Sequence, residues 1–335
     1  MSGQLAERSG TFVSDGQLNG AVGWTLLVIG LALAALLDPW MFSVASAEEF
    51  SDSIRPALRH AQGVVLAMAL LQLAMGYLLA TSAFAEKVRR TAAWLTTIGS
   101  LLYTAGYALG LAWPAFHGLV LLGSLVNFSG FAYLLSMRPQ GEFARQIRMI
   151  LPIACFGMLL DFVAGTLGFL PEAIVRNYFG AEDEIRLRMM RLARVAVIAL
   201  SVVTLLYLGV ARRCQQQITL ARRGGIILAF GAIGMPSILV AASFVSLHLK
   251  YLLALPATAV SVGVFFGLYF AVRHGGKLEV WGWFLIAASI SVGMLIGFYA
   301  FDGPLPAPTN FEQYNGPARR LSRMAHSYCI VLGIL

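Results

Sequence analysis

Charged residues are scarce in this chain. Only 12% of its 335 residues are charged, whereas 59% are hydrophobic. Soluble domains carry about 25% charged residues, so a soluble globular protein is excluded, and the composition predicts an all-α polytopic membrane protein. The formal charge of +8 then concerns membrane topology and surface contacts, and nucleic acid is not an expected partner.

Cysteine and histidine are also rare. The three cysteines, Cys155, Cys214 and Cys329, are widely scattered and form neither a disulfide framework nor a CxxC metal pair nor a CxxCH haem-attachment site. Five histidines are present, and no apolar segment contains a series of Glu, Lys or His that is typical of a proton wire. These absences exclude a protein stabilised by a framework of disulfide bonds and a protein with covalently attached c-type haem.

Long apolar segments are abundant. A bilayer core about 30 Å thick needs roughly 20 apolar helical residues. This length predicts about ten visible transmembrane helices, near residues 23–44, 57–83, 92–113, 116–137, 149–169, 192–211, 225–247, 251–272, 280–301 and from 321 onward. The last segment reaches only Leu335, so we expect a chain that is truncated within a helix.

Basic residues are densest in one set of loops. The loops 85–91, 138–148, 211–223 and 272–279 contain twelve Lys or Arg residues and three acidic ones, whereas the opposite loops are longer and balanced in charge. Because Lys and Arg are enriched on the cytoplasmic side, we expect these loops and the N-terminus to be cytoplasmic. The expected location is the bacterial inner membrane, with the lipid bilayer as a partner.

An internal repeat is indicated by three Asp-to-Arg pairs. Asp38 precedes Arg59 by 21 residues, Asp161 precedes Arg194 by 33, and Asp302 precedes Arg323 by 21. The arginines lie 135 and 129 residues apart, a period that accommodates four helices. The pattern predicts a pseudo-threefold arrangement of four-helix units, with twelve helices in a complete chain. The expected domains are a cytoplasmic tail (1–20), a first unit (21–148), a second unit (149–279) and a truncated third unit (280–335).

Few polar residues lie inside the apolar segments. Asp161 is the one acidic residue well inside a predicted span, and Gln72 and Asn127 are the notable neutral ones. Ionisable groups within a membrane are costly and are functional candidates by default. Asp161 could carry protons or neutralise an arginine, or its helix could sit deeper and place it near the interface.

Two histidines lie in the first turns of helices that are predicted to enter the membrane from its outer side. His60 and His326 occupy nearly equal depths by the repeat, so they form a candidate axial pair for a haem iron, or are satisfied core residues. Arg59, Arg320 and Arg323 lie within a turn of them. Their guanidinium groups could hold haem propionates, bind lipid headgroups or pair with nearby acidic residues.

The local sequences are His60-Ala61-Gln62-Gly63 and Met324-Ala325-His326-Ser327-Tyr328. Together with the threefold repeat of four-helix units, they resemble the catalytic subunit of haem–copper oxidases, a superfamily that includes terminal oxidases and nitric oxide reductases. The resemblance implies haem ligands on the second and tenth helices. Tyr328 stands in place of a second histidine, and the segment 192–211 has no histidine for copper. We therefore expect a divergent relative that binds one b-type haem or none, and no copper.

The leading hypothesis is an electron-transfer or accessory subunit of a respiratory complex, at most an oxidoreductase, with His60 and His326 as metal ligands. Its expected partners are other membrane subunits or a redox protein at the outer face. No catalytic residue is assigned. The alternatives are a multi-pass transporter, with Asp161, Gln72 and Asn127 marking a midplane site, and a membrane scaffold without chemistry.

Overall fold

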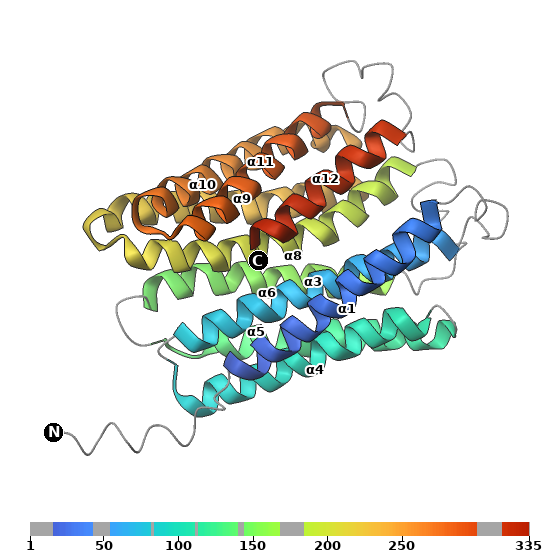
Figure 1. Cartoon of the computed structure of the whole chain (residues 1–335), viewed down its shortest axis with the longest axis horizontal. Coiled ribbons are helices and arrows are strands. Elements are labelled where there is room, and N and C mark those ends of the chain that lie inside the picture. Colours follow the sequence, from blue (N-terminus) through green and yellow to red (C-terminus); the bar gives the residue numbers. More distant parts are fainter. Residues whose placement is uncertain are drawn as a thin grey trace. The chain divides into compact units, whose positions relative to one another are not determined.

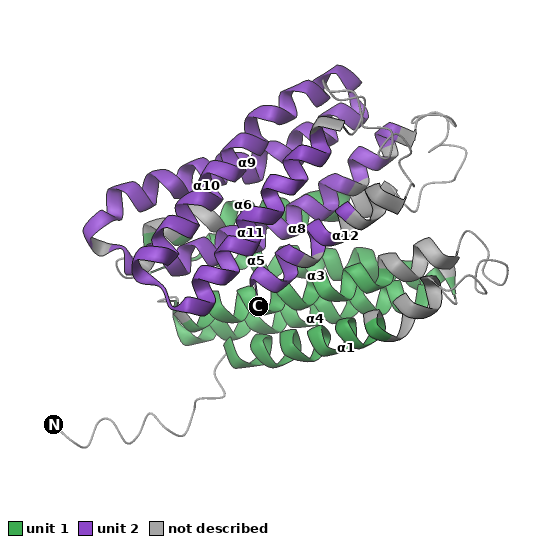
Figure 2. Cartoon of the chain, turned by 45° about the horizontal axis from the view of Figure 1, so that its top comes forward, with its two compact units in different colours: residues 1–165 green, residues 166–335 purple. Residues whose placement is uncertain are grey.

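The computed structural model describes residues 16–42, 54–81, 84–110, 113–139, 144–167, 184–299 and 317–334. This part of the chain contains ten α-helices and no strand (Figure 1). It divides into two compact units, Met1–Gly165 and Thr166–Leu335 (Figure 2). The all-helical prediction is confirmed, while the threefold repeat of four-helix units and its predicted boundaries stay predictions.

Unit 1 contains five α-helices. They are α1 (Gly16–Phe42), α3 (Ile54–Thr81), α4 (Glu86–Gly110), α5 (Gly118–Ser136) and α6 (Ala144–Leu167), and the short 3₁₀ helix η2 (Pro114–His117) joins α4 to α5. The predicted tail differs from the structure in residues 16–20, which form the first turn of α1, and residues 1–15 lie outside the described residues.

Unit 2 contains α8 (Glu184–Arg213), α9 (Ile218–Phe244), α10 (Ala254–His274), α11 (Lys277–Tyr299) and α12 (Pro317–Ile334). The 3₁₀ helices η3 (Gln215–Gln217) and η4 (Leu247–Leu253) connect α8 to α9 and α9 to α10. α8 starts before the predicted span at 192 because an arginine-rich stretch continues the helix beyond its apolar part.

Glycines bring α4 and α5 into backbone contact. A Cβ atom added at Gly123 would lie 2.5 Å from the backbone nitrogen of Tyr103 and 2.7 Å from the carbonyl oxygen of Gly99. A Cβ atom at Gly106 would lie 2.6 Å from the backbone nitrogen of Val120. Small residues allow such close approach of membrane helices, so α4 and α5 form a tightly packed antiparallel pair.

The α1–α3 pair has the same kind of contact. A Cβ atom added at Gly16 would lie 2.7 Å from the carbonyl oxygen of Gly76, and one at Gly23 would lie 2.9 Å from the backbone nitrogen of Leu73. The two glycines of α1 flank Asn19, so the close approach of α1 carries the Asn19 side chain into the interior, where it is 0% exposed.

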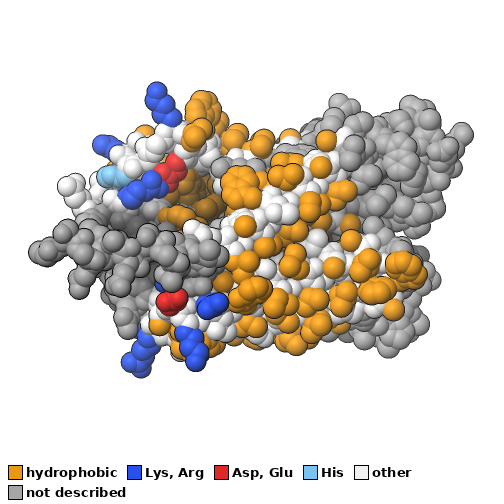
Figure 3. Space-filling model, turned by 60° about the horizontal axis from the view of Figure 1, so that its bottom comes forward, with side chains coloured by type: hydrophobic (Ala, Val, Ile, Leu, Met, Phe, Trp, Pro, Cys, Tyr) orange, Lys and Arg blue, Asp and Glu red, His pale blue; other side chains and the backbone are white. Residues whose placement is uncertain are grey.

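Seven helices are long and apolar enough to cross a membrane among the residues described: Gly16–Leu33, Ala61–Ala80, Ala115–Ser136, Arg188–Ala211, Ile218–Phe244, Leu247–His274 and Lys277–Gly297. The apolar stretches of α6 and α12, Leu151–Val163 and Ala325–Ile334, are shorter. Hydrophobic side chains cover much of the face drawn in Figure 3. The protein is therefore an integral, multi-pass membrane protein whose helices contact lipid.

Basic residues gather at the same ends of paired helices. In unit 1, Lys87, Arg89 and Arg90 lie on the first turns of α4, and Arg138 follows the C-terminus of its antiparallel partner α5. In unit 2, Gly263 of α10 packs on Leu228 of α9, which places Arg273 near the start of α9 and its arginines. Within each unit, the basic loops of the sequence analysis therefore lie at one end of the helices.

Candidate functional site

A cluster of buried polar side chains joins three helices of unit 1. Asn19 of α1 donates from Nδ2 to Gln72 Oε1 of α3 at 2.5 Å. The same nitrogen lies 3.0 Å from Thr96 Oγ1 and 3.3 Å from Thr97 Oγ1 of α4. Asn19, Gln72 and Thr96 are each 0% exposed. Interhelical hydrogen bonds of this kind hold membrane helices together.

Gln72 extends the cluster along α4. Its Nε2 donates to the carbonyl oxygen of Thr96 and to Ser100 Oγ, both at 2.8 Å. Ser100 Oγ in turn donates to Asn127 Oδ1 of α5 at 3.4 Å, and Asn127 Nδ2 lies 3.9 Å from Met68 Sδ. The structure thus brings Gln72 and Asn127, which the sequence singles out separately, into one network through Ser100.

Asp161 of α6 lies beside this network. Its side chain is 1% exposed. Tyr103 donates its hydroxyl hydrogen to Oδ1 at 3.0 Å, and Ser124 donates to Oδ2 at 2.7 Å. Tyr103 is three residues beyond Ser100 on α4, and Ser124 is three residues before Asn127 on α5, so each is one turn away on the same face. The two groups form a polar tract along the α4–α5 pair.

Two members of the tract lie within helices long and apolar enough to cross a membrane, α3 and α5. Ser124 is near the centre of the apolar stretch Ala115–Ser136, and Gln72 lies inside Ala61–Ala80. Because Ser124 contacts Asp161, the carboxylate sits at the mid-depth of α5. Of the two placements that the sequence leaves open, this geometry favours an interior position over an interfacial one.

No known protein family, curated protein or solved structure matches this chain.

Hydroxyl-bearing members of the tract are not singled out by the sequence analysis. They are Thr96, Thr97, Ser100, Tyr103 and Ser124, together with the amide of Asn19. Their spacing in the sequence is the signal that could have identified them. Thr96, Ser100 and Tyr103 lie at i, i+4 and i+7, so they share one helix face. The corresponding residues of α5, Ser124 and Asn127, are three apart.

Of the predicted haem residues, the structure describes the side chain of His326. Its Nδ1 lies 2.7 Å from the carbonyl oxygen of Ser289 on α11, and Ser289 Oγ donates to the carbonyl oxygen of His326 at 2.6 Å. The ring packs on Gly293, where an added Cβ atom would lie 2.6 Å from Cε1. The side chains of the other predicted residues lie outside the described ones: Arg59, His60, Arg320 and Arg323.

The haem pair itself stays a prediction. His60 belongs to unit 1 and His326 to unit 2. Within the described part of the chain, no group of three or more His, Cys, Asp or Glu residues could hold a metal ion. A haem needs one or two axial ligands from the protein, so its binding does not require such a group.

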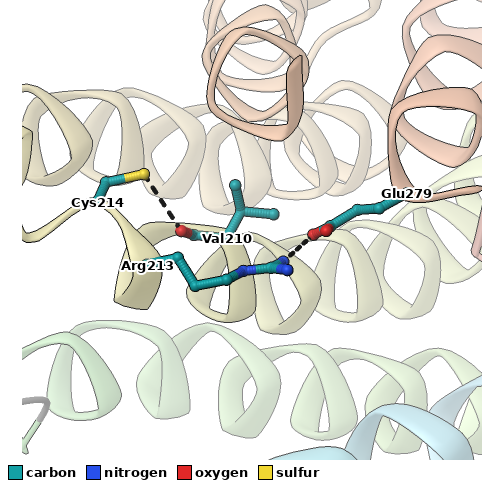
Figure 4. Close-up of polar contacts among 4 residues, drawn as sticks. All are labelled: Val210, Arg213, Cys214 and Glu279. Atoms are coloured by element: carbon teal, nitrogen blue, oxygen red, sulfur yellow. Dashed lines mark hydrogen bonds and ion pairs between the residues drawn. The ribbon is translucent and has the colours of Figure 1, made fainter. Parts of the chain in front are cut away.

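An ion pair joins the basic ends of α8 and α11. The Arg213 guanidinium contacts the Glu279 carboxylate, and the neighbouring Cys214 thiol donates to the carbonyl oxygen of Val210 at 3.3 Å (Figure 4). Burial raises the pKa of the Cys214 thiol, Arg213 opposes this effect, and Glu279 adds to it. A protonated thiol is a poor nucleophile, so this cluster is a structural link between helices.

Proposed function

We propose that this chain is a multi-pass membrane transporter that moves protons across the bilayer, with Asp161 as the proton-carrying group. The observation that carries the proposal is the buried carboxylate of Asp161, held at mid-depth by the hydroxyls of Tyr103 and Ser124. Ionisable groups at such depth are expensive, and they mark ion pathways and proton relays in many membrane proteins.

The polar tract supports the same function. Hydroxyl groups can both donate and accept hydrogen bonds, so Ser100, Tyr103 and Ser124 provide exchangeable protons near the carboxylate. The tract runs along α4 and α5 from Asp161 toward the helix ends that carry the basic residues. The Lys and Arg bias assigns these ends to the cytoplasm. Asp161 would then exchange protons with the cytoplasmic side through this tract.

Reconstituted vesicles test the proposal directly. The purified protein is incorporated into liposomes that enclose a pH-sensitive dye, and a potassium gradient with valinomycin sets an inside-negative potential. We expect proton uptake at a rate at least about tenfold above that of protein-free liposomes. Equal rates in the two preparations would overturn proton transport.

The topology is part of the proposal. We infer ten crossing helices, a cytoplasmic N-terminus and a location in the bacterial inner membrane. In a cysteine-free background, we expect a cysteine at Arg222 to resist a membrane-impermeant maleimide in intact cells and to react after permeabilisation. Labelling at Arg222 in intact cells would reverse the orientation. A cysteine at His248, in the connection at the other end of α9, is the matched control and should react from outside.

A haem-binding electron-transfer subunit is the second candidate, and one observation favours it. The Nδ1–H of His326 can donate to the Ser289 carbonyl, which fixes the ring and leaves Nε2 as the nitrogen able to bind iron. A bound b-type haem would supply one-electron redox chemistry. Arg320 and Arg323 are the candidate anchors for its propionates, and a redox protein at the outer face would be the partner.

An absorption spectrum separates this candidate from the first. If haem is bound, the purified protein should show a Soret band and a sharp α band after reduction with dithionite. Ser289→Ala should shift the midpoint potential, because it removes the Ser289 hydroxyl that lies 2.9 Å from His326 Nδ1. A colourless preparation from cells supplied with haem precursor would exclude the haem function.

A further inference from the structure

The start of α9 and the end of α10 present an exposed basic surface. Arg222 and Arg223 lie on the second turn of α9, and Arg273 lies on the last turn of α10. All three side chains are exposed, and so is that of Lys277 at the start of α11. Four positive charges are therefore gathered at one end of unit 2.

These four charges have little acidic compensation. Glu279 is the one acidic residue between positions 211 and 280 of the sequence. Its carboxylate contacts the Arg213 guanidinium on α8. Within the described part of the chain, none of the four basic side chains is in an ion pair. A surface with such an excess of positive charge attracts anions.

Packing between α9 and α10 brings their arginines close in level. A Cβ atom added at Gly224 of α9 would lie 2.9 Å from the Cβ atom of Phe266 on α10. Arg223 precedes Gly224 by one residue, and Arg273 follows Phe266 by seven. Because the helices are antiparallel, both arginines lie on the same side of this contact, about 9 Å apart along the axis. Long arginine side chains extend toward the membrane surface, so the Arg223 guanidinium can reach the level of Arg273.

The Arg273 guanidinium lies over an exposed aromatic ring. Its Cζ atom is 5.6 Å from the centre of the Tyr269 ring, one turn earlier on α10. This separation allows a cation–π interaction. Tyrosine is enriched at the boundary between the bilayer core and water. The contact therefore holds the Arg273 charge at the depth where lipid phosphates lie.

An exposed apolar face continues from the arginines toward the membrane interior. Phe230 follows Arg223 by seven residues, and Val262 precedes Tyr269 by seven, so each pair shares one helix face. Phe230, Val262 and Tyr269 are all exposed. Because α8 packs against both α9 and α10, the exposed faces of this pair lie on the side away from α8. An anionic group above apolar chains fits this surface, whereas an acidic soluble partner would leave the apolar part unused.

We propose that Arg223 and Arg273 bind the phosphate headgroup of an anionic phospholipid, whose acyl chains lie along the apolar face of α9 and α10. Guanidinium groups bind phosphate oxygens bidentately. Arg222 and Lys277 add to the attraction, and Tyr269 is a positioning residue for Arg273. A zwitterionic headgroup carries an ammonium group that this surface repels, so a headgroup with net negative charge is favoured.

The lipid site is independent of the proposed function. All of its residues belong to unit 2, whereas Asp161 and its hydrogen-bond partners belong to unit 1. Asp161→Asn should therefore lose proton flux and keep lipid binding. Proton flux without lipid preference would refute only the lipid site, and lipid preference without proton flux would refute only the proposed function.

Native mass spectrometry of the purified protein tests the headgroup preference. The protein in a nonionic detergent is titrated with dioleoyl phosphatidylglycerol or with dioleoyl phosphatidylcholine, which has the same acyl chains. We expect the first phosphatidylglycerol to bind at least about tenfold more tightly, and the difference to shrink as the concentration of ammonium acetate rises. Equal retention of the two lipids would overturn the proposal.

Glutamine variants locate the site. The double variant Arg223→Gln/Arg273→Gln should lower the affinity for the first phosphatidylglycerol at least about tenfold. Lys87→Gln/Arg90→Gln is the matched control, because it removes two exposed positive charges from α4 of unit 1. This control should keep the affinity within about twofold of wild type. An equal loss in both double variants would show that net charge alone attracts the lipid and would overturn the assignment.

Two substitutions at Tyr269 test its positioning role. Tyr269→Leu removes the ring and should weaken phosphatidylglycerol binding about threefold, whereas Tyr269→Phe keeps the ring and should bind as wild type does. Equal binding by the leucine and phenylalanine variants would overturn the positioning role.

Glycerol phosphate separates a lipid from a free anion. It carries the phosphate chemistry of the headgroup without acyl chains, so millimolar glycerol phosphate should leave phosphatidylglycerol bound. Displacement of the lipid at that concentration would show that the apolar face contributes nothing and would overturn a lipid-specific site.

Discussion

Proton uptake into vesicles is expected to fall at least about tenfold when Asp161 is replaced by asparagine. Asparagine keeps the size of the side chain and can still form hydrogen bonds with Tyr103 and Ser124, but it does not take up and release protons in the range where a carboxyl group does. Asp161→Glu retains the acid and should preserve a measurable part of the flux. The measurement is the dye-loaded vesicle assay under the same potential for each variant.

Ser129→Ala on α5 is the matched control for this loss. The Ser129 hydroxyl bonds to the Leu125 carbonyl at 2.8 Å on the exposed side of the helix, away from the polar tract. Its removal should leave the rate within about twofold of wild type. If the Asp161→Asn protein elutes as a folded species and still conducts protons at the wild-type rate, Asp161 is not the carrier.

The second large effect concerns the folding of unit 1. Gly123→Leu should destabilise the protein by at least about 3 kcal/mol, because even the first atom of the new side chain would lie 2.5 Å from the Tyr103 backbone nitrogen. Backbone cannot move away as a flexible side chain can, so α4 and α5 would have to separate. The expected result is a strongly lowered Tm or loss of folded protein in detergent.

Gly118→Ala provides the comparison on the same helix. A Cβ atom at Gly118 meets no heavy atom within 4 Å, so this substitution should change Tm by about 1 °C or less. A Gly123→Leu protein as stable as wild type would show that α4 and α5 do not contact each other through their backbones.

The sequence predicts the helical class of the fold well, because apolar length alone determines which segments prefer lipid. It is less informative about where each helix begins. Gly16 to Gly20 resembles a polar tail, yet these residues form the start of α1, because close glycine contacts with α3 allow Asn19 to be buried. Such contacts depend on tertiary packing, which local composition does not encode.

The candidate site is predictable only in part for a related reason. Gln72, Asn127 and Asp161 are conspicuous because bulky polar groups are rare in apolar segments. Thr96, Ser100 and Ser124 are not, because small hydroxyl residues are common in membrane helices, where they can bond to the preceding turn of their own helix. Which of them face Gln72 and Asp161 depends on helix rotation, and only the packed structure determines that.

The glycine contacts between α4 and α5 have a mechanical consequence. Two helices in backbone contact at Gly99, Gly106 and Gly123 cannot slide or rotate against each other without steric clash. We therefore expect α4 and α5 to move together as one rigid body. α1 and α6 contact this α4–α5 pair through side-chain hydrogen bonds at Asn19 and Asp161, which can be exchanged for others. Because α1 is itself in backbone contact with α3, any motion that opens unit 1 to alternate sides of the membrane should move the α1–α3 pair and α6 against the rigid α4–α5 pair.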